Sequence, residues 1–374
     1  MQKIMGMKHF ILTHLLAIST VAVVAGESRN SDRELIDRVI QWQMANQPNV
    51  KHHDLDWTNA VLYKGIAEWA EYTHNESYYR FLIDICEDNA WGFLDRLYHA
   101  DDLAVAQTYL KLYDRYKAPY MIKNIFARVD SILYNPSVVA LHHPDGNTRW
   151  SWCDALFMAP PVLIRLSELS GDRKYVDFMH AEFKVTTDSL FNSDYGLFYR
   201  DIRYKSRKEE NGMPIFWGRG NGWVFGALAL IIESLPVDDP ELDYYRELYL
   251  SMAEAIIKCQ DDEGSWHASM LDHNAYPMAE NSASSFFVYG LAWGINRGIL
   301  TGKEYDTALD KGWITLKSYV DAEGKLGSVQ PIGASPKLAT PDMTEVYGVG
   351  AFLMAGSQIM RSTGGVVHYV NSPK

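Results

Sequence analysis

The repeating unit of this chain is clearest in Trp152-Cys-Asp-Ala-Leu-Phe-Met-Ala-Pro-Pro-Val-Leu-Ile-Arg-Leu-Ser-Glu-Leu169, which is followed by Gly171-Asp-Arg-Lys-Tyr175. Apolar residues recur at three- and four-residue spacing through 152–169, which predicts a helix that is buried on nearly all sides. The polar segment at 171–175 interrupts the helix and ends in a tyrosine; we call such a segment a breaker cluster. After it, the spacing of apolar residues becomes that of an amphipathic helix. One unit is therefore an apolar helix, a short polar turn and a helix with one charged face.

The same unit recurs along the chain at unequal intervals. Breaker clusters that end in tyrosine stand at 74–79, 117–120, 171–175, 238–245 and 302–305. The apolar helices are expected at 58–72, 103–115, 152–169, 220–234, 283–299 and 346–361. A helix near 32–46 and those after each tyrosine are amphipathic.

Six apolar helices that alternate with six amphipathic ones predict an all-α fold, the (α/α)6 barrel or six-hairpin toroid. In this fold the apolar helices form an inner ring and the amphipathic helices cover it. A straight α-solenoid is the alternative architecture. The unequal spacing of the repeats and the aromatic-rich loops favour the closed barrel.

Composition limits the classes of partner. The chain has 374 residues and a net charge of −12, which argues against nucleic acid and anionic membrane surfaces as partners. An anionic substrate would need locally placed Arg or Lys. Because no linker rich in Pro, Gly or Ser divides the sequence, we expect a single domain over 26–374.

The first 25 residues have the pattern of an export signal. Lys3 and Lys8 precede an apolar run over 10–25 that ends in small or medium-sized side chains. A membrane anchor is the alternative, but the run is short and contains hydroxyl and imidazole side chains. We expect removal of 1–25, a periplasmic or secreted protein, and no membrane association afterwards.

Acidic residues stand where the apolar helices are expected to begin. In a toroid these N-terminal ends meet on one face of the molecule. Asp154 lies between Trp152 and Phe157, where burial against aromatic rings would raise the pKa of its carboxyl and suit it to act as a general acid. The plainer interpretation is a first-turn aspartate that stabilises the helix dipole.

A second pair of carboxylates opens the preceding apolar helix. Asp101 and Asp102 are adjacent, and we expect one of them to cap the helix and the other to face the cavity. A carboxylate close to Asp154 would raise the pKa of one member of the pair by charge repulsion. This predicts a two-carboxylate site.

The segment Trp217-Gly-Arg219-Gly-Asn221-Gly-Trp223 is the other aromatic cluster. Indole rings suit the apolar faces of sugars, and the flanking glycines would hold Arg219 in a defined place. A guanidinium can bind a carboxylate through two parallel hydrogen bonds. Arg200 is a second candidate for anion binding. Either arginine could instead belong to a solvated surface. Together with the carboxylates, these residues indicate a carbohydrate-active enzyme.

Metal and cofactor chemistry is not expected. The histidines lack the spacing of a zinc site, and no glycine-rich phosphate loop is present. His143 is interpreted as a partner for a sugar hydroxyl. Three widely separated cysteines do not form a disulfide framework; they are Cys86, Cys153 and Cys259.

At these residues the chain resembles the unsaturated rhamnogalacturonyl hydrolases, glycoside hydrolase family 105, and more distantly the unsaturated glucuronyl hydrolases. The resemblance covers nearly the whole chain after residue 26, and it is carried by the segments at 101–109, 152–160, 216–223 and 280–284. It implies an (α/α)6 barrel in which Asp154 is the general acid and base. It places the second family aspartate at Asp101 or Asp102, with Asp101 preferred. The substrate-binding candidates are Trp152, His143, Arg200, Trp217, Arg219, Asn221 and Trp223.

The resemblance also implies a reaction. Such enzymes hydrate the C4=C5 vinyl ether of a 4,5-unsaturated uronic acid at the non-reducing end of an oligosaccharide made by a lyase. We expect an anionic unsaturated oligosaccharide as substrate, with an unsaturated galacturonyl residue as the sugar removed. The alternatives are an inverting glycosidase that acts on saturated oligosaccharides and a non-catalytic exported sugar-binding protein. The oligomeric state is left open.

Overall fold

The computed structural model describes residues 30–143 and 148–362. The predicted signal peptide at 1–25 therefore lies outside the described residues. Within them helices are the main secondary structure, with short 3-10 turns at Gln47–Asn49 and Ile202–Tyr204 and one small hairpin of β1 (Phe191–Asn192) and β2 (Leu197–Phe198). None of the described helices is long and apolar enough to cross a membrane.

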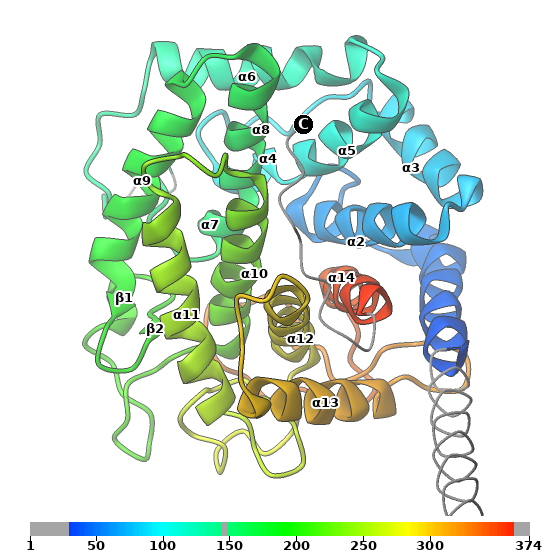
Figure 1. Cartoon of the computed structure of the whole chain (residues 1–374), viewed down its shortest axis with the longest axis vertical. Coiled ribbons are helices and arrows are strands. Elements are labelled where there is room, and N and C mark those ends of the chain that lie inside the picture. The colour runs from blue at the N-terminus through cyan, green and yellow to red at the C-terminus, as the bar shows by residue number, and fades with distance from the viewer. Residues whose placement is uncertain (1–29, 144–147, 363–374) are drawn as a thin grey trace, which may run out of the picture.

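Six apolar helices of the described chain form a closed inner ring. In chain order they are α2 (Trp57–Thr73), α5 (Ala106–Tyr116), α8 (Pro160–Ser170), α10 (Gly218–Ser234), α12 (Asn281–Asn296) and α14 (Val346–Arg361). Each contacts the next, and α14 returns to contact α2, so that the last segment lies beside the first (Figure 1).

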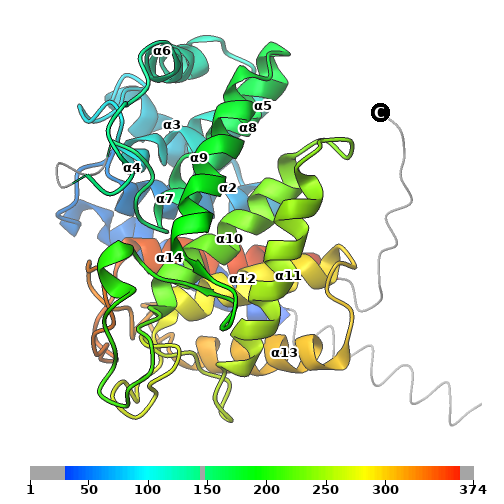
Figure 2. The same cartoon turned by 90° about the vertical axis from the view of Figure 1, so that its left-hand side faces the viewer.

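Amphipathic helices surround this ring. They are a helical segment at 30–46, α3 (Glu76–Asp88), α6 (Tyr120–Tyr134), α9 (Lys174–Leu190), α11 (Leu242–Lys258) and α13 (Lys303–Ser318). The two rings differ in burial, since 14 of the 16 residues of α12 are buried but only 4 of the 13 residues of α3. Figure 2 shows α9, α11 and α13 on the outside of α10 and α12. The predicted (α/α)6 barrel is confirmed.

Ring closure depends on two glycines. A Cβ atom at Gly65 of α2 would lie 2.2 Å from the carbonyl oxygen of Gly350 in α14. A Cβ atom at Gly350 would lie 2.2 Å from the carbonyl oxygen of Val61. The two helices therefore pack backbone against backbone, which any larger residue would prevent.

Two of the expected apolar helices are each broken near their start, which corrects the predictions for 103–115 and 152–169. The one-turn helix α4 (Ala100–Leu103) precedes α5, and α7 (Ala155–Met158) precedes α8. Pro160 begins α8, and Pro161 follows it; neither can donate a backbone hydrogen bond, so the helix cannot run through from α7. The breaks matter because α4 and α7 contact each other and carry the acidic residues.

Candidate active site

Asp101 and Asp154 start the two short helices that meet inside the ring. Asp101 lies in the first turn of α4, and Asp154 is the residue immediately before α7. Although 53 positions separate them in the sequence, the negative charge of Asp154 raises the pKa of Asp101. The contact of α4 with α7 thus builds the predicted pair of carboxylates.

The environment of Asp101 disfavours its charged form. Burial, and next the charge of Asp154, raise its pKa to about 8. Its Oδ1 atom is buried and has no hydrogen-bond partner among the described residues. Its Oδ2 atom lies 3.7 Å from Nδ1 of His99. A carboxyl group in this position holds its proton at neutral pH.

Asp154 has a cation beside it. Burial raises the pKa of this carboxyl, while the guanidinium of Arg200 opposes the shift. Nε of Arg200 lies 3.6 Å from Oδ2 of Asp154. Asp201 accepts a 2.7 Å hydrogen bond from Nη1 of Arg200 and a 2.9 Å bond from Nε of Arg203, which anchors Arg200 at its other end. The structure thus places Arg200 at the carboxylate pair.

Asp102 points away from the pair. Only 1% of its side chain is exposed, and its carboxylate accepts hydrogen bonds from the backbone N–H and the guanidinium of Arg96. The question between the two adjacent aspartates is thus answered by geometry, since Asp101 faces Asp154 and Asp102 anchors the loop before α4.

Trp152 and His99 form one wall of the site. Their ring centroids lie 4.9 Å apart, and Trp152 is buried. Burial lowers the pKa of His99 to about 4, so its ring is neutral, and Nδ1 accepts a hydrogen bond from the N–H of Asp101. His99 had no role in the sequence prediction. Its position two residues before an aspartate at a helix start is the signal that could have found it.

The pattern of Glycosyl Hydrolase Family 88 matches residues 35–363 of this chain. The chain belongs to Glycosyl Hydrolase Family 88. This family 88 protein is therefore a hydrolase, and the predicted resemblance to the unsaturated uronyl hydrolases is confirmed.

Individual relatives of the family 88 protein are similar over most of their length. An "Unsaturated 3S-rhamnoglycuronyl hydrolase" from Alteromonas sp. (strain LOR) is 38% identical over 342 residues, which cover 87% of this chain and 81% of the relative. A relative of the same name from Formosa agariphila is 35% identical over 336 residues, which cover 87% of this chain and 89% of the relative. The structure of a family 88 glycosyl hydrolase from Bacteroides vulgatus superposes with a TM-score of 0.80 at 29% identity, covering 89% of this chain and 99% of that one.

The sequence predicts that Arg219 of this family 88 enzyme binds substrate, whereas in the structure its guanidinium is bonded within the protein. Its side chain is 1% exposed, and its terminal nitrogens donate to the carbonyl oxygens of Gln330 and Pro331. The guanidinium also lies 4.5 Å from the ring of Trp217 and 4.8 Å from that of Tyr347. Arg219 thus ties α10 to the loop before α14, and a substrate carboxylate would have to compete with these backbone carbonyls.

Asn221 also serves the interior rather than an open surface. Its side chain is fully buried, accepts a 2.7 Å hydrogen bond from the N–H of Phe198, and donates to the carbonyl oxygens of Phe198 and Trp217. These bonds join the β2 strand to the start of α10. The structure thus gives Asn221 a structural role, as it does Arg219, and the predicted binding roles of both residues stay predictions.

The remaining predicted aromatics lie in the wall behind the site. Trp217 and Trp223 are both buried, and Trp223 packs edge-on against Trp57 with ring centroids 5.8 Å apart. Trp57 in turn stacks on Tyr347 at 5.1 Å and is partly exposed. His143 is an exposed loop residue next to the undescribed segment 144–147, so its role as a sugar partner stays a prediction.

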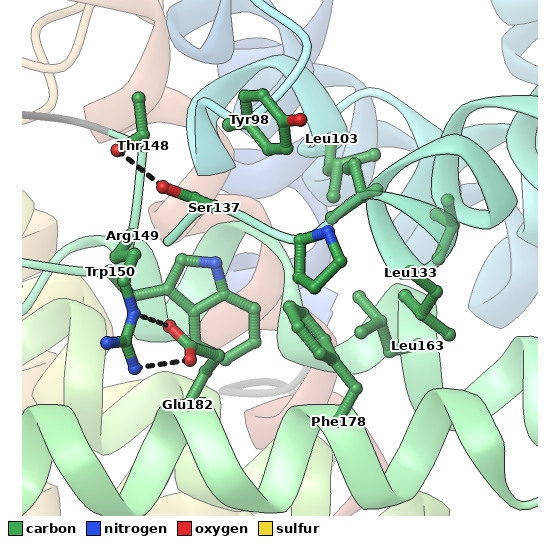
Figure 3. Close-up of a pocket in the computed structure, with 13 residues that line it drawn as sticks. Tyr98, Leu103, Leu133, Ser137, Thr148, Arg149, Trp150, Leu163, Phe178 and Glu182 are labelled. Atoms are coloured by element: carbon green, nitrogen blue, oxygen red, sulfur yellow. Dashed lines mark hydrogen bonds and ion pairs between the residues drawn. The ribbon is translucent and has the colours of Figure 1, made fainter. Parts of the chain in front are cut away.

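A small cavity lies beside α4, between α6 and α9 (Figure 3). Leu103 and Trp150 line it, and Arg149 and Glu182 form an ion pair there. Its volume is about 40 Å3, well below the ~300–1,000 Å3 of ligand sites. This cavity is therefore too small for the sugar substrate.

Metal ligands do not gather in the described ranges. Across 30–143 and 148–362, no three His, Cys, Asp or Glu side chains are grouped as a metal site. Cys153 donates a 3.5 Å hydrogen bond to Asp154, and burial raises the pKa of its thiol well above the usual value. This thiol is therefore a packing group beside the carboxylates and not a nucleophile.

Proposed function

We propose that this family 88 enzyme removes a 4,5-unsaturated uronic acid from the non-reducing end of oligosaccharides made by lyases. The observation that carries the proposal is the buried pair of Asp101 and Asp154, with Arg200 3.6 Å from Asp154. Hydration of an enol ether requires a proton donor, which a protonated carboxyl supplies. The carboxylate next to the enol ether requires a cation, which an arginine supplies. The homologous enzymes named above act on unsaturated glycuronyl compounds by their names.

The reaction is a hydration of the C4=C5 bond. Asp154 donates a proton to C4, and the cation that develops at C5 is shared with the ring oxygen. Water adds its oxygen to C5 and loses a proton to the carboxylate left behind. The resulting hemiketal opens by breaking the bond between C5 and the ring oxygen, and the open-chain product releases the aglycone from C1.

The carboxylate pair supplies the proton at neutral pH. Because burial and the charge of Asp154 raise the pKa of Asp101 to about 8, the two carboxyls hold one proton between them at neutral pH, and in the reaction that proton passes to Asp154 for donation to C4. Arg200 supports binding of the uronate carboxylate, because its Nε has no hydrogen-bond partner among the described residues. The buried indole of Trp152 and the neutral ring of His99 limit access of water.

The linkage to rhamnose is proposed from the relatives. The two curated relatives that cover 87% of this chain at 38% and 35% identity are both named for an unsaturated 3S-rhamnoglycuronyl substrate. We therefore assign this chain an unsaturated uronyl residue joined to rhamnose; elimination removes the C4 stereocentre, so the galacturonyl residue expected from the sequence and a glucuronyl residue give the same unsaturated sugar. Comparing kcat/KM on an unsaturated uronyl-rhamnose disaccharide and on an unsaturated uronyl disaccharide with a different aglycone sugar tests this assignment.

The reaction itself is tested by ultraviolet absorbance. The enzyme should remove the alkene absorbance of an unsaturated uronyl-rhamnose disaccharide and leave saturated analogues intact. Asp154→Asn should lower kcat by about 10²-fold or more, because general acid catalysis contributes about 10²–10⁴-fold. Its melting temperature should stay close to that of the wild type. Activity of this variant near the wild-type level, or cleavage of saturated substrates, would refute the mechanism.

Export is proposed from the sequence alone. Residues 1–25, with Lys3 and Lys8 before an apolar run, support it as a signal peptide. N-terminal sequencing of the protein recovered from its native host should begin near residue 26. A mature protein that still begins at Met1 would contradict the proposal.

A further inference from the structure

A second hollow lies on the face of the barrel where the inner helices begin. The end of the helical segment 30–46, the loop before α2 and the start of α14 enclose a pocket of about 370 Å3. That volume falls within the ~300–1,000 Å3 of ligand sites. We name it the rim pocket; it is lined by Trp42, Gln43, Asn46, Asn49, Val50, Lys51, His52, Thr344, Glu345 and Val346.

Several polar atoms of the rim pocket have no partner. Neither Asn49 nor Lys51 makes a side-chain hydrogen bond or ion pair with the described part of the chain. The hydroxyl oxygen of Thr344 is buried, and no described residue bonds to it. Asn49 and Lys51 are exposed and can reach a ligand, whereas the buried hydroxyl of Thr344 costs free energy while it is unsatisfied, so a polar ligand that bonds to it would be favoured.

The chemistry of the lining suits a sugar. Trp42 is half-buried and contributes an aromatic surface, while Asn46 uses its amide nitrogen on the carbonyl oxygen of Trp42 and leaves its amide oxygen unpaired. Amides and hydroxyls match the alternating donors and acceptors of a pyranose. Oε2 of Glu345 lies 3.1 Å from Nε2 of His52, so this carboxylate is paired with His52 and not with Lys51. Lys51 is therefore the side chain that can bind an anionic substituent.

The loop over 52–56 connects the rim pocket to the carboxylate pair. His52 lines the pocket, and four residues later the charge of Asp56 acts on both His99 and Asp101. Four residues of chain span on the order of 14 Å at most. Trp57, which follows, stacks on Tyr347 two residues beyond Glu345. One oligosaccharide could therefore contact both places.

We infer that the rim pocket is a distal subsite that binds an anion-bearing pyranosyl residue of the substrate, beyond the linkage that is cleaved. The inference rests on the proposed function, because the ligand is taken to be the aglycone side of the same oligosaccharide. It predicts that the enzyme favours longer substrates over a disaccharide, and that this preference depends on Trp42, Asn49 and Lys51.

The test compares a lyase-generated unsaturated tetrasaccharide with the uronyl-rhamnose disaccharide, which lacks the distal residue that the pocket is proposed to bind. Trp42→Ala, Asn49→Ala and Lys51→Gln should each lower kcat/KM for the tetrasaccharide, by about tenfold for Trp42→Ala, a loss of ~1.4 kcal/mol of binding. The disaccharide value serves as the internal reference. Tyr134→Ala and Lys123→Gln, exposed positions on α6, are matched controls.

Equal effects on both substrates, or no effect on either, would overturn the subsite. Failure of the proposed function would look different, since the wild type would then leave the alkene absorbance of both substrates unchanged. In that case calorimetric titration of the full chain with the tetrasaccharide decides the question. Binding that weakens in Asn49→Ala and Lys51→Gln supports the subsite, and binding that is unchanged in both refutes it.

Discussion

At the scale of single residues, the chemistry depends on how one proton is divided between Asp101 and Asp154. Asp101 is buried, and the charges of Arg96, which is bonded to Asp102, and of Arg200 only partly oppose the rise in its pKa. Arg200 favours the charged form of Asp154. The pair is therefore expected to titrate as a unit, and its second proton leaves only as the pH approaches about 8.

The first prediction concerns the pH profile of Asp101→Asn. Without Asp101 there is no second carboxyl to hold the shared proton, and Arg200 favours the charged form of Asp154, so the acid loses its proton at lower pH. The alkaline limb of kcat should move down by about one pH unit or more. Asp102→Asn, which alters a carboxylate bonded to Arg96, should leave that limb in place. An unchanged limb in Asp101→Asn would show that the two carboxyls do not share a proton.

The second prediction concerns stability. The pKa of Asp101 is about 8 in the folded protein and about 3.9 in an unfolded chain, so folding favours the protonated form. The stability of the wild type should fall as pH rises from about 4 to 8. Asp101→Asn does not titrate there, so its melting temperature should exceed that of the wild type by several degrees at pH 8 and by little at pH 4. A difference that does not grow with pH would contradict this.

At the scale of elements, buried hydrogen bonds position the loops around the site. Glu280 begins α12, and its carboxylate accepts hydrogen bonds from the N–H groups of Ser282, Ala283 and Gln330. Arg219 reaches the same loop through the carbonyl oxygen of Gln330. The 280–284 motif thus acts as a helix cap that holds the loop before α14, so its charge is used for structure.

Asn221→Ala is the element-scale test. It removes three hydrogen bonds and leaves the N–H of Phe198 buried without a partner. Such a group costs about 1–3 kcal/mol, so we expect the free energy of unfolding to fall by about 3 kcal/mol in urea titration. Asn124→Ala, at a half-buried amide that water can replace, should cost less than about 1 kcal/mol. Equal losses would refute the structural role of Asn221.

At the scale of the whole molecule, the ring is closed by the contact of α2 with α14. Gly65→Ala would place a methyl group 2.2 Å from a backbone oxygen of Gly350, and a backbone atom cannot rotate away. We expect a loss of more than about 3 kcal/mol in the free energy of unfolding, or failure to fold. Gly171→Ala meets no atom within 4 Å and carries a φ of +69°, so it should cost about 1 kcal/mol. Denaturant unfolding compares the two, and a similar loss in both would contradict the ring-closure argument.

The sequence by itself determined the two rings and limited the candidate carboxylates to Asp154 and one of two adjacent aspartates. Helical periodicity is a local property, so α2, α10, α12 and α14 were predicted within a few residues, and Asp154 stood out by its aromatic neighbours. Only the tertiary structure decided which acidic residue faces Asp154 and which arginine stays near it. Asp101 and Asp102 look alike in sequence, and the partners of Arg219 lie more than a hundred residues away. Hydrogen bonds between distant segments depend on how the rings close, and no local pattern encodes that.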